Sequence, residues 1–199
     1  MKSADGSGEA KAIGTGWGAA FSPDGRYLLF ADLDKQNDFD LWYLDLQGDG
    51  KQIPLLKAAG VQIWPRLSPD GRYFTYTSDE SGLEEVYVKR FPSAEGKWQV
   101  STSGGQWPRW SRRGDRLYYV QGETVMEVDV AAGPDLRLGA PRALFSRKPL
   151  GWGLIFGWPP GFDVSPQGDR FVISQGVGEE QEDNGIVVLE NWPREFARP

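Results

Sequence analysis

The hexapeptide Ser-Pro-Asp-Gly-Arg-Tyr occurs twice in this chain, at residues 22–27 and again at residues 68–73. Serine begins a type I turn, proline presets φ at the next position, and glycine takes the left-handed conformation that realigns the outgoing chain. Each copy follows an apolar residue (Phe21 or Leu67) and precedes an apolar and aromatic run. The hexapeptide therefore predicts a tight connection between two antiparallel strands and not an active site.

Two weaker copies of the turn extend the pattern, Ser-Arg-Arg-Gly at 111–114 and Ser-Pro-Gln-Gly at 165–168. Successive turn serines lie 46, 43 and 54 residues apart. Four short strands in each unit of this length are typical of a β-propeller blade. Strands are expected after each turn at 27–30, 73–76, 117–120 and 171–173, then at 41–46, 85–91, 124–130 and 185–191, and finally at 52–57, 98–101 and 142–145.

The sequence thus predicts an all-β protein, a β-propeller with four recognisable four-stranded antiparallel blades. Its repeats span approximately 15–57, 62–103, 106–146 and 160–192 within one domain at 10–199, and the Gly- and Ser-rich residues 1–9 are expected to be flexible. The last unit lacks a fourth strand, which either residues 10–13 or a second chain would supply. An open arc would expose strand edges. Three arrangements avoid this: a small four-bladed ring, a homodimer of two half-rings, or inclusion in a longer chain.

The composition excludes several classes of function. The chain has no Cys and no His, so it has neither a thiolate nucleophile nor a Ser-His-Asp triad, and enzyme activity is not the favoured interpretation. A net charge of -6 argues against nucleic acid as a partner. No stretch is apolar enough to span a membrane and the N-terminus lacks a signal-peptide core, so a cytoplasmic location is the default expectation.

Several motifs also resemble a known family. Lys-Trp-Gln-Val-Ser at 97–101, Gly-Gly at 104–105 and Pro-Arg-Trp-Ser at 108–111 are similar to the TolB-type, WD40-like propeller repeats of bacteria, in the order that family has them. The resemblance covers about residues 15–192 and is greatest to the C-terminal propellers of bacterial serine/threonine protein kinases and of some transcriptional regulators. It implies the sensor or scaffold part of a signalling protein. No nucleotide loop or catalytic Asp loop is present, so kinase activity does not carry over.

The first candidate site consists of Trp-Pro pairs that precede the innermost strands. Trp64, Trp107 and Trp158 are each followed by proline, and Trp17-Gly18 is taken as the equivalent of the first repeat. Converging aromatic faces at the mouth of the channel could bind a sugar, a peptide or a Pro-rich segment. The alternative is that these rings pack one blade against the next.

The second candidate is positive charge near the channel. Arg66 and Arg109 each lie one residue after a Trp-Pro pair. This placement suits an anionic ligand such as a carboxylate, although each arginine could instead pair with an acid on an adjacent blade.

The third candidate is a set of carboxylate clusters that could hold Ca²⁺ at a propeller axis. No dedicated Ca²⁺ loop is recognisable, and solvated turn acids are the ordinary alternative. The clusters comprise Asp32, Asp34, Asn37, Asp38 and Asp40; Asp79, Glu80, Glu84 and Glu85; and the acids at 179–183. A Trp- and Gly-rich insertion at 148–161 could form a lid or a contact surface.

The leading functional hypothesis is a non-catalytic propeller that binds a protein or a small molecule, without a cofactor, at the channel mouth. Its ligand-binding residues would be Trp64, Arg66, Trp107, Arg109 and Trp158. The alternative is a metal-assisted, Ca²⁺-type hydrolase of esters, lactones or phosphotriesters.

Overall fold

The computed structural model describes residues 9, 12–33, 38–131, 133, 135–146, 162–165, 167–176 and 184–190. Regular structure in these ranges consists of strands β1 to β16, which confirms the all-β prediction. None of the described residues belongs to a helix that is long and apolar enough to cross a membrane.

The first two blades are four-stranded antiparallel sheets whose strands pair in chain order. Blade 1 contains β1 (Trp17–Phe21), β2 (Tyr27–Leu33), β3 (Phe39–Asp45) and β4 (Gln52–Leu56). Blade 2 contains β5 (Gln62–Leu67), β6 (Tyr73–Ser78), β7 (Glu85–Arg90) and β8 (Trp98–Gln99).

The third blade has a divided outer edge, and three strands are described in the fourth. Blade 3 contains β9 (Gln106–Trp110), β10 (Arg116–Gln121) and β11 (Thr124–Ala131), and both β12 (Arg137–Leu138) and β13 (Arg142–Ser146) pair with β11. Blade 4 contains β14 (Phe162–Val164), β15 (Arg170–Gly176) and β16 (Asn184–Glu190). The strands expected from the sequence are therefore present, within one or two residues at most ends.

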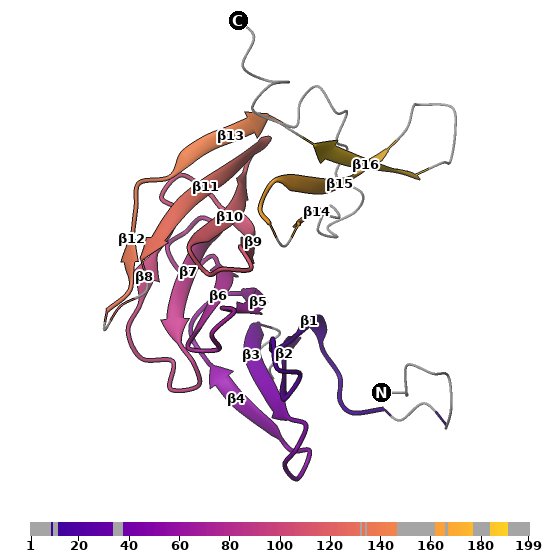
Figure 1. Cartoon of the computed structure of the whole chain (residues 1–199). Coiled ribbons are helices and arrows are strands. Elements are labelled where there is room, and N and C mark those ends of the chain that lie inside the picture. The colour runs from indigo at the N-terminus through magenta and orange to yellow at the C-terminus, as the bar shows by residue number, and fades with distance from the viewer. Residues whose placement is uncertain are drawn as a thin grey trace, which may run out of the picture.

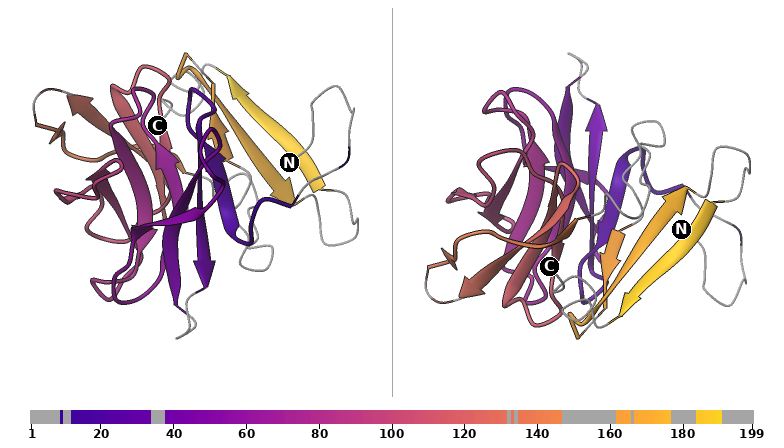
Figure 2. Two further views of the ribbon diagram at one scale, coloured as in Figure 1. Left: turned by 90° about the horizontal axis from the view of Figure 1, so that it is seen from below. Right: turned by 90° about the horizontal axis from the view of Figure 1, so that it is seen from above.

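The four blades follow one another around an arc (Figure 1). The first strands of the blades, β1, β5, β9 and β14, line its inner side, and the later strands lie further out. Seen from below and from above, the sheets of blades 1, 2 and 3 stand in succession, and the strands of blade 4 are seen next to those of blade 1 in projection (Figure 2). Residues at corresponding places on the inner strands therefore face a common region.

Each turn is fastened by the same set of hydrogen bonds. In the first copy the Ser22 amide donates to the Tyr27 carbonyl at 2.8 Å, and the Gly25 amide donates to the Ser22 carbonyl at 2.9 Å. Gly25 has φ 71°, and the glycines of the other three copies have φ between 70° and 75°. These values are in the left-handed region that favours glycine, as the sequence predicts.

The turn serine also binds an aspartate, but not at a fixed position. Ser22 and Ser68 donate a hydroxyl hydrogen bond to the aspartate two residues later, Asp24 or Asp70. Ser111 instead donates to Asp115, four residues later, at 2.7 Å. The fourth copy repeats this second arrangement, with Ser165 donating to Asp169. The position of the aspartate thus differs between the first two and the last two turns, but all four turns have the hydrogen bond from the serine to the aspartate.

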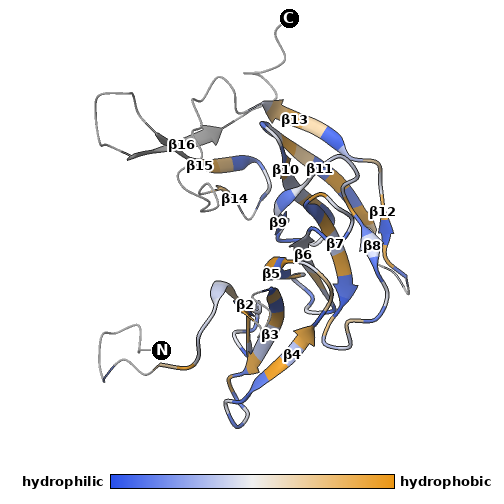
Figure 3. Cartoon of the chain, turned by 180° about the vertical axis from the view of Figure 1, so that it is seen from behind, coloured by the Kyte–Doolittle hydropathy of each residue, from blue (hydrophilic) through white to orange (hydrophobic). Residues whose placement is uncertain are grey.

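The hydrophobic core lies between the blades. Figure 3 shows hydrophobic residues recurring along the strands among polar ones, so each sheet presents apolar side chains to its neighbours. One cluster joins blades 1 and 2 and includes Leu29 and Leu67, a second joins blades 2 and 3, and a third joins blades 3 and 4 and includes Tyr118 and Phe171. Each junction between consecutive blades is therefore a packed interface.

The segment before β1 does not extend the last blade in the part that is described. Residues 12–16 form no strand, whereas residues 10 and 11 lie outside the described residues. Ile13 and Gly14 instead line a cavity of about 80 Å³ with Leu28, Phe30 and Leu44 of blade 1. Of the two ways to complete blade 4, the described residues thus offer no support for the N-terminal strand.

Candidate functional site

The innermost strands of blades 1, 2 and 3 share a bulge. Gly18, Trp64 and Trp107 have φ of 63°, 58° and 55°, and the pairing of β1, β5 and β9 with the neighbouring strand shifts register there. A tryptophan in the left-handed region is uncommon and strained, by roughly 1–3 kcal/mol. Residues held in such conformations gather at functional sites, so the bulges draw attention to this part of the inner face.

The bulge corrects one alignment made from the sequence. Trp64 and Trp107 lie four residues before their turn serines, and in the first blade this position is Gly18, not Trp17. Trp158 lies seven residues before Ser165, so it does not correspond to the other two tryptophans, and it falls outside the described residues.

The tryptophans of the two described Trp-Pro pairs, Trp64 and Trp107, lie within blade junctions. Trp107 is 7% exposed and packs with Tyr118, Phe162 and other residues between blades 3 and 4. Trp64 is partly buried against the same cluster, and its ring also lies against Gly18 of blade 1. Both rings therefore pack blade against blade, which was the alternative to a convergent aromatic binding site.

Arg66 extends from blade 2 toward blade 1. Its Nη1 donates to the Gly18 carbonyl at 3.0 Å and to the Pro65 carbonyl at 2.8 Å. Burial lowers the pKa of Arg66 to about 10, and the nearby positive charge of Arg109 acts in the same direction. The guanidinium therefore stays charged at neutral pH, in a place that penalises the charge.

Arg109 extends in the opposite sense, from blade 3 toward blade 4. Its Nε lies 3.8 Å from Oδ1 of Asp163, and its guanidinium carbon lies 5.9 Å from the centre of the Phe162 ring. The Arg109 side chain is only 17% exposed, and burial lowers its pKa although the charge of Asp163 opposes that change. The sequence left open an anion site or a pair with an acid on an adjacent blade, and the structure contains a long-range pair of the second kind.

Asp163 is the site residue that the sequence reasoning missed. It lies two residues before its turn serine, as do Ala20, Arg66 and Arg109 in the other blades. One corresponding inner-strand position therefore carries Ala, Arg, Arg and Asp in the four blades. Counting back from the turn serine, instead of following the Trp-Pro pairs, would have found it.

The site has an excess of positive charge. The charges of two mostly buried guanidiniums act on one carboxylate, that of Asp163, which is 77% exposed and lies 3.8 Å from Arg109. A buried charge is stabilised by close, hydrogen-bonded partners of opposite sign. Arg66 has backbone carbonyls as hydrogen-bond acceptors, and among the described residues it forms no ion pair within 4 Å.

The carboxylates near 79–85 have structural contacts. Glu85 is buried, accepts a hydrogen bond from the Ser101 hydroxyl and accepts another from the Gly104 amide at 2.9 Å. Asp79 accepts from the Val61 amide at 2.7 Å, and Glu80 pairs with Lys97 at 2.7 Å. These acids hold strand ends and loops in place.

The other clusters are described only in part. Asp32 accepts a hydrogen bond from Thr15, and Asp40 is buried 3.8 Å from Lys57. Asp34 and Asn37 lie outside the described residues, as do the acids at 179–183 and the insertion at 148–161. Within the part of the chain that the structure describes, no group of three or more His, Cys, Asp or Glu side chains could hold a metal ion.

Comparisons with known proteins agree with the fold. No protein-family model matches the chain. An uncharacterised protein of Agrobacterium fabrum is 27% identical over 106 residues, which are 53% of this chain and 34% of that protein. The solved structure of TolB from Acinetobacter baumannii superposes with a TM-score of 0.66 at 18% identity, over 89% of this chain and 41% of TolB. The fold is therefore that of the TolB-type β-propellers.

The same fold also occurs in enzymes. An oligogalacturonate lyase, solved in complex with manganese, superposes with a TM-score of 0.57 at 11% identity, over 83% of this chain and 45% of the lyase. The chain spans less than half the length of each of these three proteins. A likeness at this level of identity describes the fold and assigns no activity.

Proposed function

We propose that this TolB-like propeller is a non-catalytic binding module whose inner face holds a carboxylate group of a protein or small-molecule ligand between Arg66 and Arg109. The observation that carries the proposal is the pair of mostly buried guanidiniums, Arg66 and Arg109, which share one exposed carboxylate, Asp163, at 3.8 Å from Arg109. Guanidiniums bind carboxylates through short, charge-assisted hydrogen bonds, which are stronger when the site is shielded from water.

A carboxylate fits this site better than an apolar ligand does. The tryptophans beside the arginines are engaged in blade packing, so they offer rigid walls and not open stacking faces. Hydrogen bonds to backbone carbonyls hold Arg66 and Arg109 in place before a ligand arrives, which reduces the ordering needed on binding.

The proposal is tested by titrating the protein with a peptide, acetyl-Gly-Ser-Glu-Glu-Gly-Ser-amide, and with its Gln-Gln counterpart, at low ionic strength. The wild-type chain should bind the acidic peptide and ignore the neutral one. The R66M/R109M variant should bind the acidic peptide at least about tenfold more weakly. Arg112, which is exposed on the third turn, provides the control R112M. Failure of the wild-type chain to bind, or equal binding by R66M/R109M, would overturn the proposal.

The same variants should separate binding from stability. Methionine keeps the apolar stem of Arg66 and removes a charge whose burial costs free energy, which offsets the loss of the hydrogen bonds to the Gly18 and Pro65 carbonyls. R66M should therefore lie within about 1 kcal/mol of the wild-type free energy of unfolding, and a loss of binding by R66M would not reflect a loss of fold.

The metal-assisted hydrolase gains no support from Asp79, Glu80 and Glu85, because these carboxylates bind an amide, a lysine, and a hydroxyl with an amide, respectively. Chelator-sensitive turnover of an activated ester would revive that alternative.

We also propose that a second copy of the chain covers the open ends of the arc. Seven residues after the turn serine, Leu29, Thr75 and Tyr118 are 0–1% exposed because the next blade covers them, whereas Val172 of blade 4 is 38% exposed. At the other end Phe21 is 60% exposed, while the corresponding Leu67 is 8% exposed. Val172 and Phe21 thus lie on the two kinds of surface that pack together at a junction between consecutive blades, and here both are exposed. Mutual docking of two copies would bury both halves by symmetry.

A further inference from the structure

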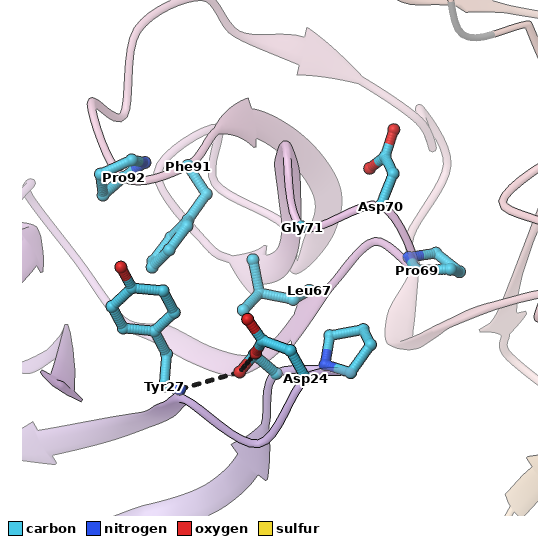
Figure 4. Close-up of a pocket in the computed structure, with 10 residues that line it drawn as sticks. Asp24, Tyr27, Leu67, Pro69, Asp70, Gly71, Phe91 and Pro92 are labelled. Atoms are coloured by element: carbon cyan, nitrogen blue, oxygen red, sulfur yellow. Dashed lines mark hydrogen bonds between the residues drawn. The ribbon is translucent and has the colours of Figure 1, made fainter. Parts of the chain in front are cut away.

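A cavity of about 300 Å³ lies between blades 1 and 2 (Figure 4). It is lined by both copies of the repeated hexapeptide and by the turn after β7. The lining residues are Ser22, Pro23, Asp24, Tyr27, Leu67, Pro69, Asp70, Gly71, Phe91 and Pro92.

The two identical hexapeptides differ in how their arginines are paired. Arg72 pairs with Asp70 of its own turn, with Nε 2.7 Å from Oδ2. Arg26 turns away from its own turn and pairs with Asp45 of β3, with Nη2 2.8 Å from Oδ2. Asp70 is thus paired with the arginine of its own turn, whereas Asp24 forms no ion pair with Arg26.

Asp24 is consequently a carboxylate with one oxygen available. Its Oδ1 accepts hydrogen bonds from the Ser22 hydroxyl and from the Arg26 amide at 3.0 Å. No described side chain forms an ion pair with Asp24. The hydrogen bond from Ser22 lowers the pKa of this carboxyl, so Asp24 is ionised at neutral pH. In Figure 4 its carboxylate lies beside Leu67, within the ring of lining residues.

Most of the other lining side chains are aromatic, aliphatic or proline rings. Tyr27 and Phe91 meet edge to face with ring centres 5.1 Å apart, and Pro92 follows Phe91 along the wall. Pro23 and Pro69 stand beside the two aspartates. Such walls suit an aliphatic stem or a proline, and they need little ordering when a ligand enters.

We propose that this cavity binds a lysine side chain presented by a Pro-containing peptide segment, with the ammonium group on Asp24 and the methylene stem against Tyr27, Leu67 and Phe91. An ammonium is a compact charge on an apolar stem, which one carboxylate oxygen at the side of an apolar cavity can accept. Arginine fits less well, because its planar guanidinium favours two carboxylate oxygens at once, and Oδ1 of Asp24 is already occupied. This site shares no residue with the arginine site, so neither proposal depends on the other.

The repeat provides a matched pair of variants. Asp24→Asn and Asp70→Asn make the same change at the same position of the same turn, and each weakens the same serine hydrogen bond. The probe is acetyl-Ala-Pro-Lys-Pro-Ala-amide, and its N-ε-acetyl-lysine counterpart tests the charge. Asp24→Asn should weaken binding of the lysine probe about tenfold or more, whereas Asp70→Asn should change it less than about threefold. The acetylated probe should not bind.

Equal losses in the two variants, or equal binding of the acetylated probe, would overturn the proposal. A measurement on the wild-type chain guards against variants that fold poorly. The carboxyl ¹³C resonance of Asp24 should move on addition of the lysine probe, while that of Asp70 should stay. No change at Asp24 when the probe is in excess would also refute the site.

Discussion

The indole ring of Trp64 in blade 2 lies directly against the backbone of Gly18 in blade 1. A Cβ atom placed on Gly18 would be 2.7 Å from Cε3 of Trp64 and 2.9 Å from its Cζ3, which is closer than carbon atoms approach. The Gly18 carbonyl also accepts the hydrogen bond from Arg66 at 3.0 Å. The bulge of blade 1 therefore contacts both Trp64 and Arg66 of blade 2.

Gly18→Ala should disturb the site, with Gly25→Ala as its matched control. Both glycines have left-handed φ, 63° and 71°, so each substitution should destabilise by about 1 kcal/mol from backbone strain. A Cβ on Gly25 meets nothing within 4 Å, whereas one on Gly18 meets the Trp64 ring. Gly18→Ala should therefore lose a further ~1–3 kcal/mol of unfolding free energy in urea melts. Equal losses would contradict the contact.

The serine–aspartate bond of the third turn should be transferable along the turn. Asp115→Asn weakens the bond from Ser111 and should destabilise the chain by about 1 kcal/mol. Arg113→Asp places a carboxylate two residues after Ser111, where the first two turns have theirs, and should restore most of that loss in the double variant. Thermal melting measures both changes. A double variant no more stable than Asp115→Asn would show that the two positions are not equivalent.

The strands and turns could be predicted because they follow local rules. Glycine at a fixed place in each turn and apolar runs after it need no knowledge of the rest of the chain. The serine binds an aspartate two residues later in the first turn (Asp24) and four residues later in the third (Asp115). This difference was not predicted, because a hydrogen bond between side chains tolerates different spacings along a loop. Asp163 was missed because the search followed tryptophan, which packs the blades, and not the register that brings corresponding inner-strand residues together.

The stability of the fold should decrease in acid. The pKa of Asp24 is held below its usual 3.8 by the Ser22 hydroxyl, and that of Asp45 by the Arg26 guanidinium. A carboxyl with a lowered folded-state pKa binds its proton less readily than the unfolded chain does, so its stabilisation is present above pH 3.8 and is lost as pH falls through the folded pKa.

The melting temperature should therefore be nearly level at neutral to mildly acidic pH and fall below roughly pH 4. Arg26→Gln should flatten this fall, because Asp45 then loses the partner that lowers its pKa. Arg112→Gln is the control and should leave the profile unchanged. A wild-type profile that is level down to pH 2 would contradict the role of these carboxyls.

The open ends of the arc predict self-association. Phe21 is 60% exposed in one copy and would be buried by a second copy, where the charge of Phe21→Asp would be unfavourable. Sedimentation equilibrium should give a dimer for the wild-type chain and a monomer for Phe21→Asp. Leu83, which is 61% exposed on a loop of blade 2, provides the control Leu83→Asp, expected to remain dimeric. A wild-type monomer at all concentrations would refute the proposal that a second copy covers the ends of the arc. Further blades of another polypeptide would then be the alternative cover for these ends.

The central claim is that Arg66 and Arg109 bind an anionic ligand together. The most direct test follows their side-chain Nε–Hε resonances by ¹⁵N NMR while the acidic peptide is added, with assignments from R66K and R109K. The account predicts that both resonances move in parallel, with one dissociation constant, while that of the exposed Arg112 stays in place. Binding of the peptide with neither Arg66 nor Arg109 shifted would contradict it.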